Sequence, residues 1–384
     1  MSENPVRVLQ VCALNAGGIE SFVMNLYRHI NRNKIIFDFI NYFDRDMEQF
    51  YEKEVIGYGS KVFKTGSMNS KNLVIRHIKK VKELYKLLRV NKYTVIHIHA
   101  SDSTSLEDAI VAKFVGVPRI IVHSHNTAIS HDDKFYWIKE IFHYIMKNLW
   151  GYVATDYFAC SELAAQWMYT KKLILSNKVK IVNNAIEFKK YLFNNNIREK
   201  LRKELNIGDK FVVGHIGRMS YQKNHEYLIE VFSEVKKQYD NSVLLLIGDG
   251  ELKNKIKKKV AELKLQDSVI FYGVTNQVEN LMQVMDVFVL PSVYEGLPLV
   301  GIESQASGLK LIVSDTISKQ MSITENVRYL SLNDGIKTWA DEILKYANGY
   351  ERIDMNKYFE SSVYDIKYIS KEIESFYERG EYDA

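Results

Sequence analysis

The sequence has few of the features that mark specialised classes of protein. Only two of its 384 residues are cysteines, Cys12 and Cys160, so no disulfide framework holds the fold together. No apolar run approaches the roughly 18 residues that a membrane-spanning helix needs, and the short stretch Val8–Leu14 does not resemble a signal peptide. The net charge is only +5, too mild for a nucleic-acid-binding protein. We therefore expect a cytoplasmic protein that binds no nucleic acid.

The composition and the order of apolar segments indicate a large globular protein with parallel sheets. Hydrophobic residues make up 46% and charged residues 26% of the chain, an ordinary globular composition. Strand-like apolar runs alternate with segments of helical period along almost the whole length, which is typical of βαβ units with helices on both faces of a sheet. The expected strands are Val6–Leu14, Phe37–Tyr42, Val95–His99, Arg119–His123, Phe211–Ile216, Val243–Ile247, Val269–Phe271, Val287–Leu290 and Leu311–Ser314.

The expected strands form two series, which indicates two domains. The first series ends near residue 185 and the second begins near residue 211, with a polar, helix-prone stretch between them. We predict a first doubly wound domain over residues 1–187, a linker over 188–209, a second domain over 210–360 and a C-terminal helix within 361–384. Proteins of this class bind ligands at the carboxyl ends of their strands.

The most informative motif follows the expected strand Val287–Leu290. Turn residues come first, and a helix is expected to begin at about Leu299. A helix N-terminus at the end of a strand favours phosphate, because its backbone N–H groups are unpaired and the helix dipole attracts negative charge. Glu295 lies in the turn before this terminus and Glu303 about one turn inside the helix. The alternative is that both are ordinary solvated carboxylates.

Two further motifs follow strands. Arg218 comes at the end of the strand Phe211–Ile216 and Lys223 follows five residues later, so both are expected on exposed loops. Two such cations can neutralise a diphosphate leaving group, or they can form a plain basic loop. The pair Gly17-Gly18 follows the first strand and either lets the backbone approach a ligand or forms a simple turn. It is not Gly-x-Gly-x-x-Gly, which argues against a nicotinamide or flavin cofactor.

In this order, the Gly-Gly loop, Gly-Arg-(x)4-Lys and Glu-(x)7-Glu resemble the retaining family-4 glycosyltransferases with the two-domain GT-B fold. The resemblance covers nearly the whole chain, and the look-alikes are bacterial capsular and exopolysaccharide glycosyltransferases. It implies an α/β protein with two doubly wound, Rossmann-like domains that face each other across a cleft. The first would be the acceptor side and the second would bind a nucleotide-sugar donor, with the C-terminal helix returning to the first domain. Further matching motifs are Val95-Ile96-His97-Ile98-His99, Ala159-Cys160-Ser161-Glu162, Val182-Asn183-Asn184-Ala185-Ile186 and Gly248-Asp249-Gly250.

The resemblance implies roles for four side chains of the second domain. Arg218 and Lys223 would bind the donor diphosphate. Glu303 would hold the ribose hydroxyls, and Glu295 would bind hydroxyls of the transferred sugar. Retention in this family is explained by attack from the front face, in which the leaving diphosphate takes the proton of the acceptor. The protein would then supply positioning and stabilisation of charge rather than a catalytic base.

The resemblance also implies roles for the backbone and for one histidine. The backbone at Leu299 and Val300 would close on the phosphates, and the Gly17-Gly18 loop would approach from the first domain. His125 matches a histidine that lies beside the donor sugar in relatives, where it either positions the sugar or transfers a proton.

The implied function is transfer of a hexosyl unit from a nucleotide sugar, which we expect to be a UDP-sugar, to a growing saccharide in capsular or exopolysaccharide biosynthesis. The acceptor is either a free or a lipid-linked saccharide, and no cofactor is implied. Two alternatives remain, another GT-B enzyme such as a nucleotide-sugar epimerase, or a non-catalytic subunit that binds a nucleotide sugar. Glu-(x)7-Glu with Gly-Arg-(x)4-Lys favours transfer, and the intact set of charged residues argues against a silent subunit.

Two patterns suggest a metal, and we expect neither to bind one. His97-x-His99 and His123-x-His125 could form a zinc site, since alternate residues of a strand share a face. Histidines at strand ends in a cleft are, however, what the resemblance already implies. The triplet Asp44-Arg45-Asp46 has the form Asp-x-Asp, but it lies far in sequence from the donor motifs, so we interpret it as a loop.

One amphipathic helix suggests contact with a membrane surface. The segment Arg76–Arg89 presents a stripe that we expect to face the core, and a basic face that lies either in solvent or on anionic lipid, at the inner face of the plasma membrane. The stripe consists of Ile75, Ile78, Val81, Leu84, Tyr85 and Leu88, and the basic face of Arg76, Lys79, Lys80, Lys82, Lys86 and Arg89. A group of aromatic residues is expected mostly in the core, or else toward the acceptor or a membrane: Phe135, Tyr136, Trp137, Phe142, Tyr144 and Trp150.

Overall fold

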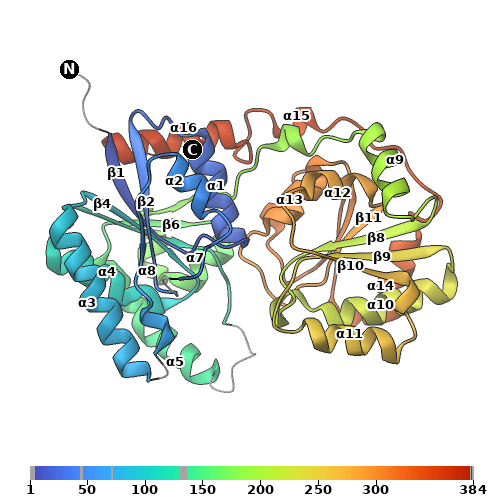
Figure 1. Ribbon diagram of the computed structural model, residues 1–384, viewed down its shortest axis with the longest axis horizontal. Coiled ribbons are helices and arrows are strands. Elements are labelled where there is room, and N and C mark those ends of the chain that lie inside the picture. The colour runs from blue at the N-terminus through green and yellow to red at the C-terminus, as the bar shows by residue number, and fades with distance from the viewer. Residues whose placement is uncertain (1–4, 44–45, 71, 130–135, 381, 383–384) are drawn as a thin grey trace. The chain divides into compact units, whose positions relative to one another are not determined.

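The computed structural model describes residues 5–43, 46–70, 72–129, 136–380 and 382 (Figure 1). The chain divides into two compact units, the first formed by the described residues up to 185 and those from Ile366 onward, and the second by Ile186–Asp365. Each unit is a parallel β-sheet with helices on both faces. The predicted fold class, two Rossmann-like α/β domains, is therefore confirmed.

The first unit contains a seven-stranded sheet among its described residues. All neighbouring strands pair in parallel, in the order β3-β2-β1-β4-β5-β6-β7. The order reverses next to β1, because the chain first winds outward to β3 and then returns to β4 on the other side of β1. The elements are β1 (Val6–Val11), α1 (Gly18–His29), β2 (Ile35–Asn41), α2 (Glu52–Gly57), β3 (Val62–Lys64), η1 (Ser67–Asn69), α3 (Leu73–Asn91), β4 (Val95–Ala100), η2 (Ser103–Ser105), α4 (Leu106–Val115), β5 (Arg119–Ser124), α5 (Tyr136–Met146), η3 (Lys147–Leu149), α6 (Trp150–Val153), β6 (Asp156–Ala159), α7 (Glu162–Met168), α8 (Lys171–Leu175) and β7 (Val179–Ile181).

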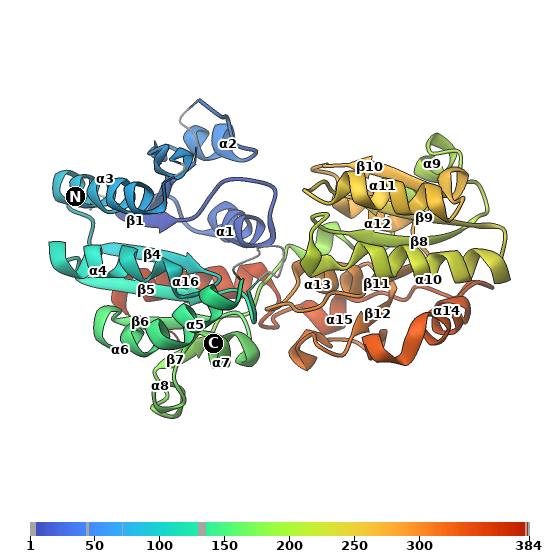
Figure 2. The ribbon, with the colours of Figure 1, turned by 90° about the horizontal axis from the view of Figure 1, so that it is seen from below.

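The C-terminal helix α16 (Ile366–Arg379) belongs to the first unit. It packs against α1 and β1, and Figures 1 and 2 show it on the opposite face of the sheet from α4. Its buried residues recur at the helical spacing seen in the sequence, and they include Ile369, Ile373 and Phe376. The helix thus covers one face of a sheet whose strands all lie more than 180 residues earlier in the chain.

The second unit contains a six-stranded sheet among its described residues. The strand order is β10-β9-β8-β11-β12-β13, again with parallel pairing. The elements are η4 (Phe188–Lys190), α9 (Asn195–Glu204), β8 (Phe211–Ile216), η5 (Tyr221–Lys223), α10 (His225–Gln238), β9 (Ser242–Ile247), α11 (Lys253–Glu262), η6 (Gln266–Ser268), β10 (Val269–Gly273), α12 (Val278–Val284), β11 (Val287–Leu290), α13 (Leu299–Ala306), β12 (Lys310–Ser314), η7 (Lys319–Met321), β13 (Val327–Leu330), η8 (Leu332–Asp334), α14 (Gly335–Leu344) and α15 (Asn356–Phe359).

The core of the second unit follows from the two-residue alternation of its strands and the 3.6-residue repeat of its helices. Alternate residues of β8, β9 and β11 point to one face of the sheet, where α10, α11 and α14 cover them. The helices contribute residues one turn apart, among them Leu228 and Phe232 of α10 and Trp339 and Ile343 of α14, all fully buried. Burial of this kind stabilises a fold by about 25 cal/mol per Å² of apolar surface.

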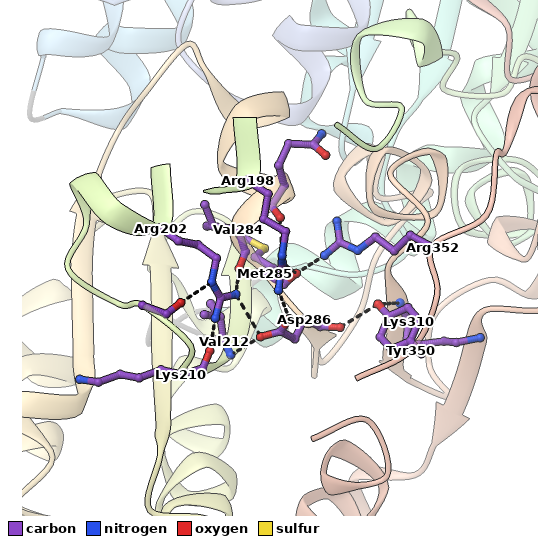
Figure 3. Close-up of polar contacts among 12 residues, drawn as sticks. Arg198, Arg202, Lys210, Val212, Val284, Met285, Asp286, Lys310, Tyr350 and Arg352 are labelled. Atoms are coloured by element: carbon purple, nitrogen blue, oxygen red, sulfur yellow. Dashed lines mark hydrogen bonds and ion pairs between the residues drawn. The ribbon is translucent and has the colours of Figure 1, made fainter. Parts of the chain in front are cut away.

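The segment expected as a linker, 188–209, contains η4 and α9 and is bound to the second unit (Figure 3). Arg198 binds Asp286 at 2.5 Å and donates to the carbonyls of Gln283 and Met285. Arg202 binds the same carboxylate at 3.3 Å and donates to the carbonyl of Val284. These polar contacts attach α9 to the end of α12 and to the residues that lead into β11, although α9 carries few apolar side chains of its own.

Four strands were not expected from the sequence. Three of them, β3, β7 and β13, are three or four residues long and lie at the edges of the sheets. The fourth, β6, is interior but has only four residues. Each of these runs is short and contains a charged residue, unlike the fully apolar run of β11, so the sequence does not separate it from a loop and pairing with a neighbouring strand determines its conformation.

The predicted core stripe of α3 is only partly correct. Leu84 and Leu88 are buried, but Ile75, Ile78 and Tyr85 are exposed. Helix α3 packs on α4 along the side that carries Leu84 and Leu88, and 3.6-residue periodicity cannot say how wide that contact is. The exposed apolar side chains therefore share the outer side of α3 with its lysines.

Two further expectations about this surface were wrong. Lys80 is not on the solvated basic face: it is buried, where it binds Glu107 at 2.7 Å and Asp108 at 3.0 Å. The aromatic group is not mostly core either, since only Trp150 is fully buried, whereas the side chains of Trp137, Phe142 and Tyr144 on α5 are exposed; Phe135 lies outside the described residues.

Within the part of the chain that the structure describes, no helix has the length and apolar character needed to cross a membrane.

Candidate functional site

The loop after β11 leads into the N-terminus of α13, as the motif predicts. Pro298 precedes the helix in an extended conformation, and α13 begins at Leu299. Among the residues that the structure describes, no side chain caps this terminus. The first-turn amides of Leu299 and Val300 belong to a helix end that lies at the carboxyl end of a central strand, where fold and dipole both favour an anion. The structure therefore places a helix N-terminus at the position where the sequence motif predicts one.

Glu295 and Lys223 are in direct contact beside this helix. Lys223 Nζ lies 2.5 Å from Glu295 Oε1, and the side chains are only 15% and 7% exposed. Gln222 donates to Glu295 Oε2 at 3.1 Å and to the carbonyl of Tyr294 at 3.1 Å. The expectation that Lys223 lies on an exposed loop was wrong, because the loop after β8 folds against the loop after β11. The charged pair is fixed by hydrogen bonds before any ligand binds.

Arg218 lies on an exposed loop, as expected. Its side chain is 74% exposed and binds Glu251 at 3.0 Å. This loop packs closely on the Gly248-Asp249-Gly250 turn: a Cβ on Gly248 would lie 2.2 Å from the carbonyl oxygen of Gly217, and Gly248 has a φ of +129°. Only glycine suits both the conformation and the contact. The matching glycines thus determine how closely the loops after β8 and β9 approach each other.

Glu303 is buried in α13, and its carboxylate faces a tyrosine of the second unit. Glu303 Oε1 accepts a hydrogen bond from the hydroxyl of Tyr191 at 2.8 Å. Burial raises the pKa of Glu303 to about 7, an effect that the Tyr191 hydrogen bond opposes and the charge of Glu279 adds to. A carboxyl group poised near neutrality inside a site is typical of a functional position. The sequence motif had identified Glu303 but gave no sign of Tyr191.

Gly17 and Gly18 form the N-terminus of α1 in the first unit. The carbonyl of Gly17 accepts from the Ser21 amide at 2.9 Å, so Gly18 is the first helical residue. A Cβ on Gly17 would meet the carboxylate of Glu20, whereas one on Gly18 would meet no atom within 4 Å. Packing among the described residues therefore does not require a glycine at position 18, and the missing side chain leaves the helix terminus open.

His125 follows β5 in the first unit and is almost fully buried. Its Nε2 is 2.9 Å from Nδ1 of His99, and its ring centroid is 4.0 Å from that of His123. Burial lowers the pKa of His125 to about 3. The pKa of His97 is also lowered to about 3, by burial and by the nearby His125. These rings are neutral near pH 7, so His125 can donate or accept a hydrogen bond but carries no charge.

The same group of histidines is the candidate metal centre among the described residues. His97, His99 and His123 each offer a ring nitrogen, and these atoms lie within 4.8 Å of one another. Both nitrogens of His99 are already in hydrogen bonds, with Gln10 and His125. The group contains no carboxylate to offset the charge of a dication, which makes burial of one costly. Asp44 and Arg45 of the Asp-x-Asp triplet lie outside the described residues.

Two family models cover most of the chain. The family described as Glycosyl transferases group 1 matches residues 197–360, and Glycosyltransferase Family 4 matches residues 16–190. The putative glycosyltransferase EpsF of Bacillus subtilis (strain 168) is 31% identical over 350 residues, which are 90% of this chain and 89% of EpsF. The chain belongs to the family 4 glycosyltransferases. This glycosyltransferase is therefore an enzyme of the hexosyltransferase class, as the motifs predict.

Relatives and one solved structure are consistent with this assignment. A UDP-Gal:alpha-D-GlcNAc-diphosphoundecaprenol alpha-1,3-galactosyltransferase of Escherichia coli is 29% identical over 63% of both chains. The capsular polysaccharide biosynthesis glycosyltransferase CapM of Staphylococcus aureus is 30% identical over 53% of this glycosyltransferase and 55% of CapM. The crystal structure of Anabaena HepE in complex with UDP and glucose has a TM-score of 0.72 at 16% identity, covering 97% of this chain and 100% of HepE. The structural likeness shows the GT-B fold.

Proposed function

We propose that this glycosyltransferase moves a hexosyl unit from a UDP-sugar to a growing saccharide of a capsule or exopolysaccharide, with retention of the anomeric configuration. The observation that carries the proposal is the partly buried group of Lys223, Gln222 and Glu295 beside the N-terminus of α13. It joins a fixed cation, a helix terminus and a carboxylate, which are the groups needed to hold a diphosphate and sugar hydroxyls. Relatives named for UDP-Gal and for capsular polysaccharide support the same substrate classes.

The proposed roles in the second unit follow from geometry and charge. Arg218 and Lys223 neutralise the diphosphate as its bond to the sugar breaks, and the amides of Leu299 and Val300 hold the phosphates. Glu303 accepts hydrogen bonds from the ribose hydroxyls. The acceptor oxygen forms its bond on the face that the diphosphate leaves, and its proton passes to the departing phosphate oxygen. Removing one stabilising donor from such a site costs roughly 10²–10³ in rate.

In the first unit, we assign His125 to a hydrogen bond with a hydroxyl of the transferred sugar, and the open N-terminus at Gly17 and Gly18 to close approach of the backbone to the substrate. A neutral imidazole suits this role, because it can bind a hydroxyl without the cost of burying a charge. The role of His125 is positioning rather than transfer of a proton, since its lowered pKa keeps it from holding a second proton near pH 7.

We also propose that the acceptor is lipid-linked and that the first unit meets the inner face of the plasma membrane through α3. The outer side of α3 combines exposed apolar residues with exposed lysines, Ile78 and Lys82 being one turn apart. Beside it lies a groove lined by His77, Ile78, Val81, Lys82, Tyr85, Ile110, Val111 and Phe114. Apolar and basic side chains on one surface suit anionic lipid, and a relative is named for an acceptor linked to diphosphoundecaprenol.

Two measurements test the reaction. Thermal unfolding with a panel of nucleotide sugars identifies the donor, because a ligand at 100 times its Kd adds about 2.7 kcal/mol of stability. Proton NMR of the product then gives the anomeric configuration. We expect stabilisation by a UDP-sugar and a product with the configuration of the donor. An inverted product would refute retention, and stabilisation only by sugars of another nucleotide would refute the UDP assignment.

A further inference from the structure

A chain of hydrogen bonds connects the C-terminal helix to His125. It begins at Tyr377 on α16, passes through Gln10 on β1 and His99 on β4, and ends at His125 after β5. The distances are 3.3 Å from Gln10 Nε2 to Tyr377 Oη, 2.9 Å from His99 Nε2 to Gln10 Oε1, and 2.9 Å from His125 Nε2 to His99 Nδ1. All four residues belong to the first unit, where α16 lies along α1 and β1 (Figure 1).

The amide of Gln10 gives this chain a direction. An amide oxygen can only accept, so His99 must carry its proton on Nε2 to donate to Gln10 Oε1. A neutral imidazole has a single N–H, so Nδ1 of His99 is an acceptor. His125 must then donate from its Nε2, and its Nδ1 is left without a proton. Each step follows from the one before it.

Tyr377 holds the amide of Gln10 in that orientation. Its hydroxyl accepts from Gln10 Nε2 and lies 2.6 Å from Nδ1 of His97; when that nitrogen is unprotonated, the hydroxyl proton points to His97 and the oxygen remains the acceptor for Gln10. If the amide turned over, its oxygen would face Tyr377 and its NH₂ group would face His99, and every proton along the chain would have to move. Tyr377 and Gln10 are both buried, so water cannot take the place of either partner.

We propose that Gln10 and Tyr377 are positioning residues which fix the tautomer of His125, so that His125 presents an unprotonated Nδ1 to a hydroxyl of the substrate. This inference rests on the proposed role of His125 in the reaction. Among the described residues, His125 Nδ1 has no hydrogen-bond partner, whereas Nε2 is held by His99. The site would therefore bind a donor, such as a sugar O–H, and would not bind an acceptor at this point.

The direct test is the tautomer itself, measured by nitrogen NMR of protein labelled with ¹⁵N in its histidine rings. Protonated and bare ring nitrogens have well separated shifts, so the readout does not depend on activity. We expect wild-type His125 to be a single Nε2–H tautomer near pH 7. A His125 that carries its proton on Nδ1 would overturn the proposal, and so would protein that purifies with one zinc ion per chain bound by these histidines.

Substitutions distinguish an effect on the tautomer of His125 from a general effect on packing. Gln10→Leu should shift the ring signals of both His99 and His125 toward values averaged over two tautomers, while Gln10→Glu, which can only accept, should keep the wild-type tautomer. Tyr377→Phe is the second variant if Gln10→Leu does not fold, and it should have the same effect as Gln10→Leu. Tyr382→Phe is the matched control, since it removes a buried hydroxyl of the same C-terminal segment that donates to Ile181 and lies outside this chain.

Kinetics give the functional readout. Gln10→Leu and Tyr377→Phe should lower kcat roughly tenfold, less than the 10²–10⁴-fold effect of a whole acid–base group, with the donor KM changed less than twofold. Unchanged ring signals in Gln10→Leu would overturn the proposal. If the tautomer shifts as expected but His125→Ala retains full activity, the tautomer assignment stands and the proposed role of His125 fails.

Discussion

Lys223 Nζ and Glu295 Oε1 lie 2.5 Å apart although 72 residues separate them in the chain. Both side chains are largely withdrawn from solvent. The cation proposed for the diphosphate is therefore held by the carboxylate proposed for the sugar. A donor that binds both residues would meet a pair whose geometry is already set, and loss of either residue leaves the other charge without this ion-pair partner.

The two cations should differ in what their removal does to stability. Lys223→Ala should lower turnover by roughly 10²–10³ and should also destabilise the fold by about 3–5 kcal/mol, because it leaves Glu295 charged and buried. Arg218→Ala should lower turnover similarly but cost at most about 1 kcal/mol, since its ion pair with Glu251 is exposed. Urea unfolding and initial rates measure both effects. Wild-type turnover in either variant would remove that residue from the leaving-group role.

Donor affinity should depend on pH through Glu303. The pKa of Glu303 is raised to about 7 by burial, and the carboxylate accepts hydrogen bonds from the ribose hydroxyls more strongly than the neutral acid does. Binding of a UDP-sugar should therefore strengthen as the pH rises through 7, by up to tenfold per unit below that value. Titration calorimetry from pH 5.5 to 8.5 measures this. A UDP-sugar is preferable to UDP, whose terminal phosphate titrates in the same range.

Tyr191 provides the matched variant for this pH dependence. Its hydrogen bond lowers the pKa of Glu303, so Tyr191→Phe should move the midpoint to higher pH. Glu303→Gln should bind more weakly and lose the dependence. A midpoint that is the same in all three proteins would show that another group controls donor binding.

The histidine group should make the first unit sensitive to acid. The pKa values of His97 and His125 are lowered to about 3 from 6.5, so the unfolded chain binds more protons than the folded protein between these values. Their contribution to stability is thus complete above pH 6.5 and is lost as the pH falls toward 3. At pH 5 the loss is about 2 kcal/mol for each histidine, which urea unfolding at pH 7.5 and 5 would measure.

His123→Phe tests whether the buried histidine group causes this acid sensitivity. Among the described residues, neither ring nitrogen of His123 has a hydrogen-bond partner, and Phe22 and Phe158 pack edge-on against its ring. Phenylalanine should therefore be tolerated at pH 7.5 and should reduce the fall in stability at pH 5. An undiminished fall would assign the acid sensitivity to other groups.

Membrane contact should depend on α3 and not on positive charge alone. Reversing three exposed lysines, Lys79, Lys82 and Lys86, to Glu should weaken binding to anionic vesicles by roughly a hundredfold or more, at about 1 kcal/mol per charge near the surface. Adding Ile78→Ser to this triple variant should weaken vesicle binding further. It should also reduce the fraction of protein that still sediments with vesicles at high salt. Co-sedimentation at low and high salt measures both.

Helix α11 supplies the control for charge. Reversing Lys255, Lys257 and Lys258, which are exposed in the second unit, makes the same change in net charge on a helix whose apolar residues Ile256 and Val260 are buried. This variant should sediment with vesicles as the wild type does. Equal losses in the two variants would indicate general charge attraction, and wild-type protein that stays in the supernatant at low salt would favour a free acceptor.

Gly18→Ala tests whether the substrate closely approaches the backbone at the N-terminus of α1. A methyl group there meets no atom within 4 Å and alanine favours a helix over glycine by about 1 kcal/mol, so the fold should be as stable as the wild type. Turnover should nevertheless fall if the substrate approaches the helix terminus. Gly151→Ala, also in open space on a helix of the same unit, is the control, and full activity of Gly18→Ala would indicate that position 18 is a simple turn.

Most interior strands and the motif positions could be predicted from the sequence because their signals are local. The run that became β11 is apolar along its whole length and the run that became β8 is apolar except for His215, as strands buried on both faces require. The turn before Leu299 contains residues typical of turns, Gly296 and Pro298, and these predicted the start of the helix correctly. The short strands β3, β7 and β13 have no such signal, since each depends on a neighbour for its conformation.

The sequence by itself determined the fold class, the order of the motifs and the family, since local periodicity and the spacing of motifs are sufficient to indicate each of these. Tertiary structure alone decided which charges are paired and which apolar residues are exposed. Lys223 is largely shielded from solvent because two loops 72 residues apart pack together, and Tyr191 reaches Glu303 across 112 residues. Ile78 stayed exposed because α4 covers only one side of α3. Contacts at such separations follow from the packing of whole elements, which no local window of sequence contains.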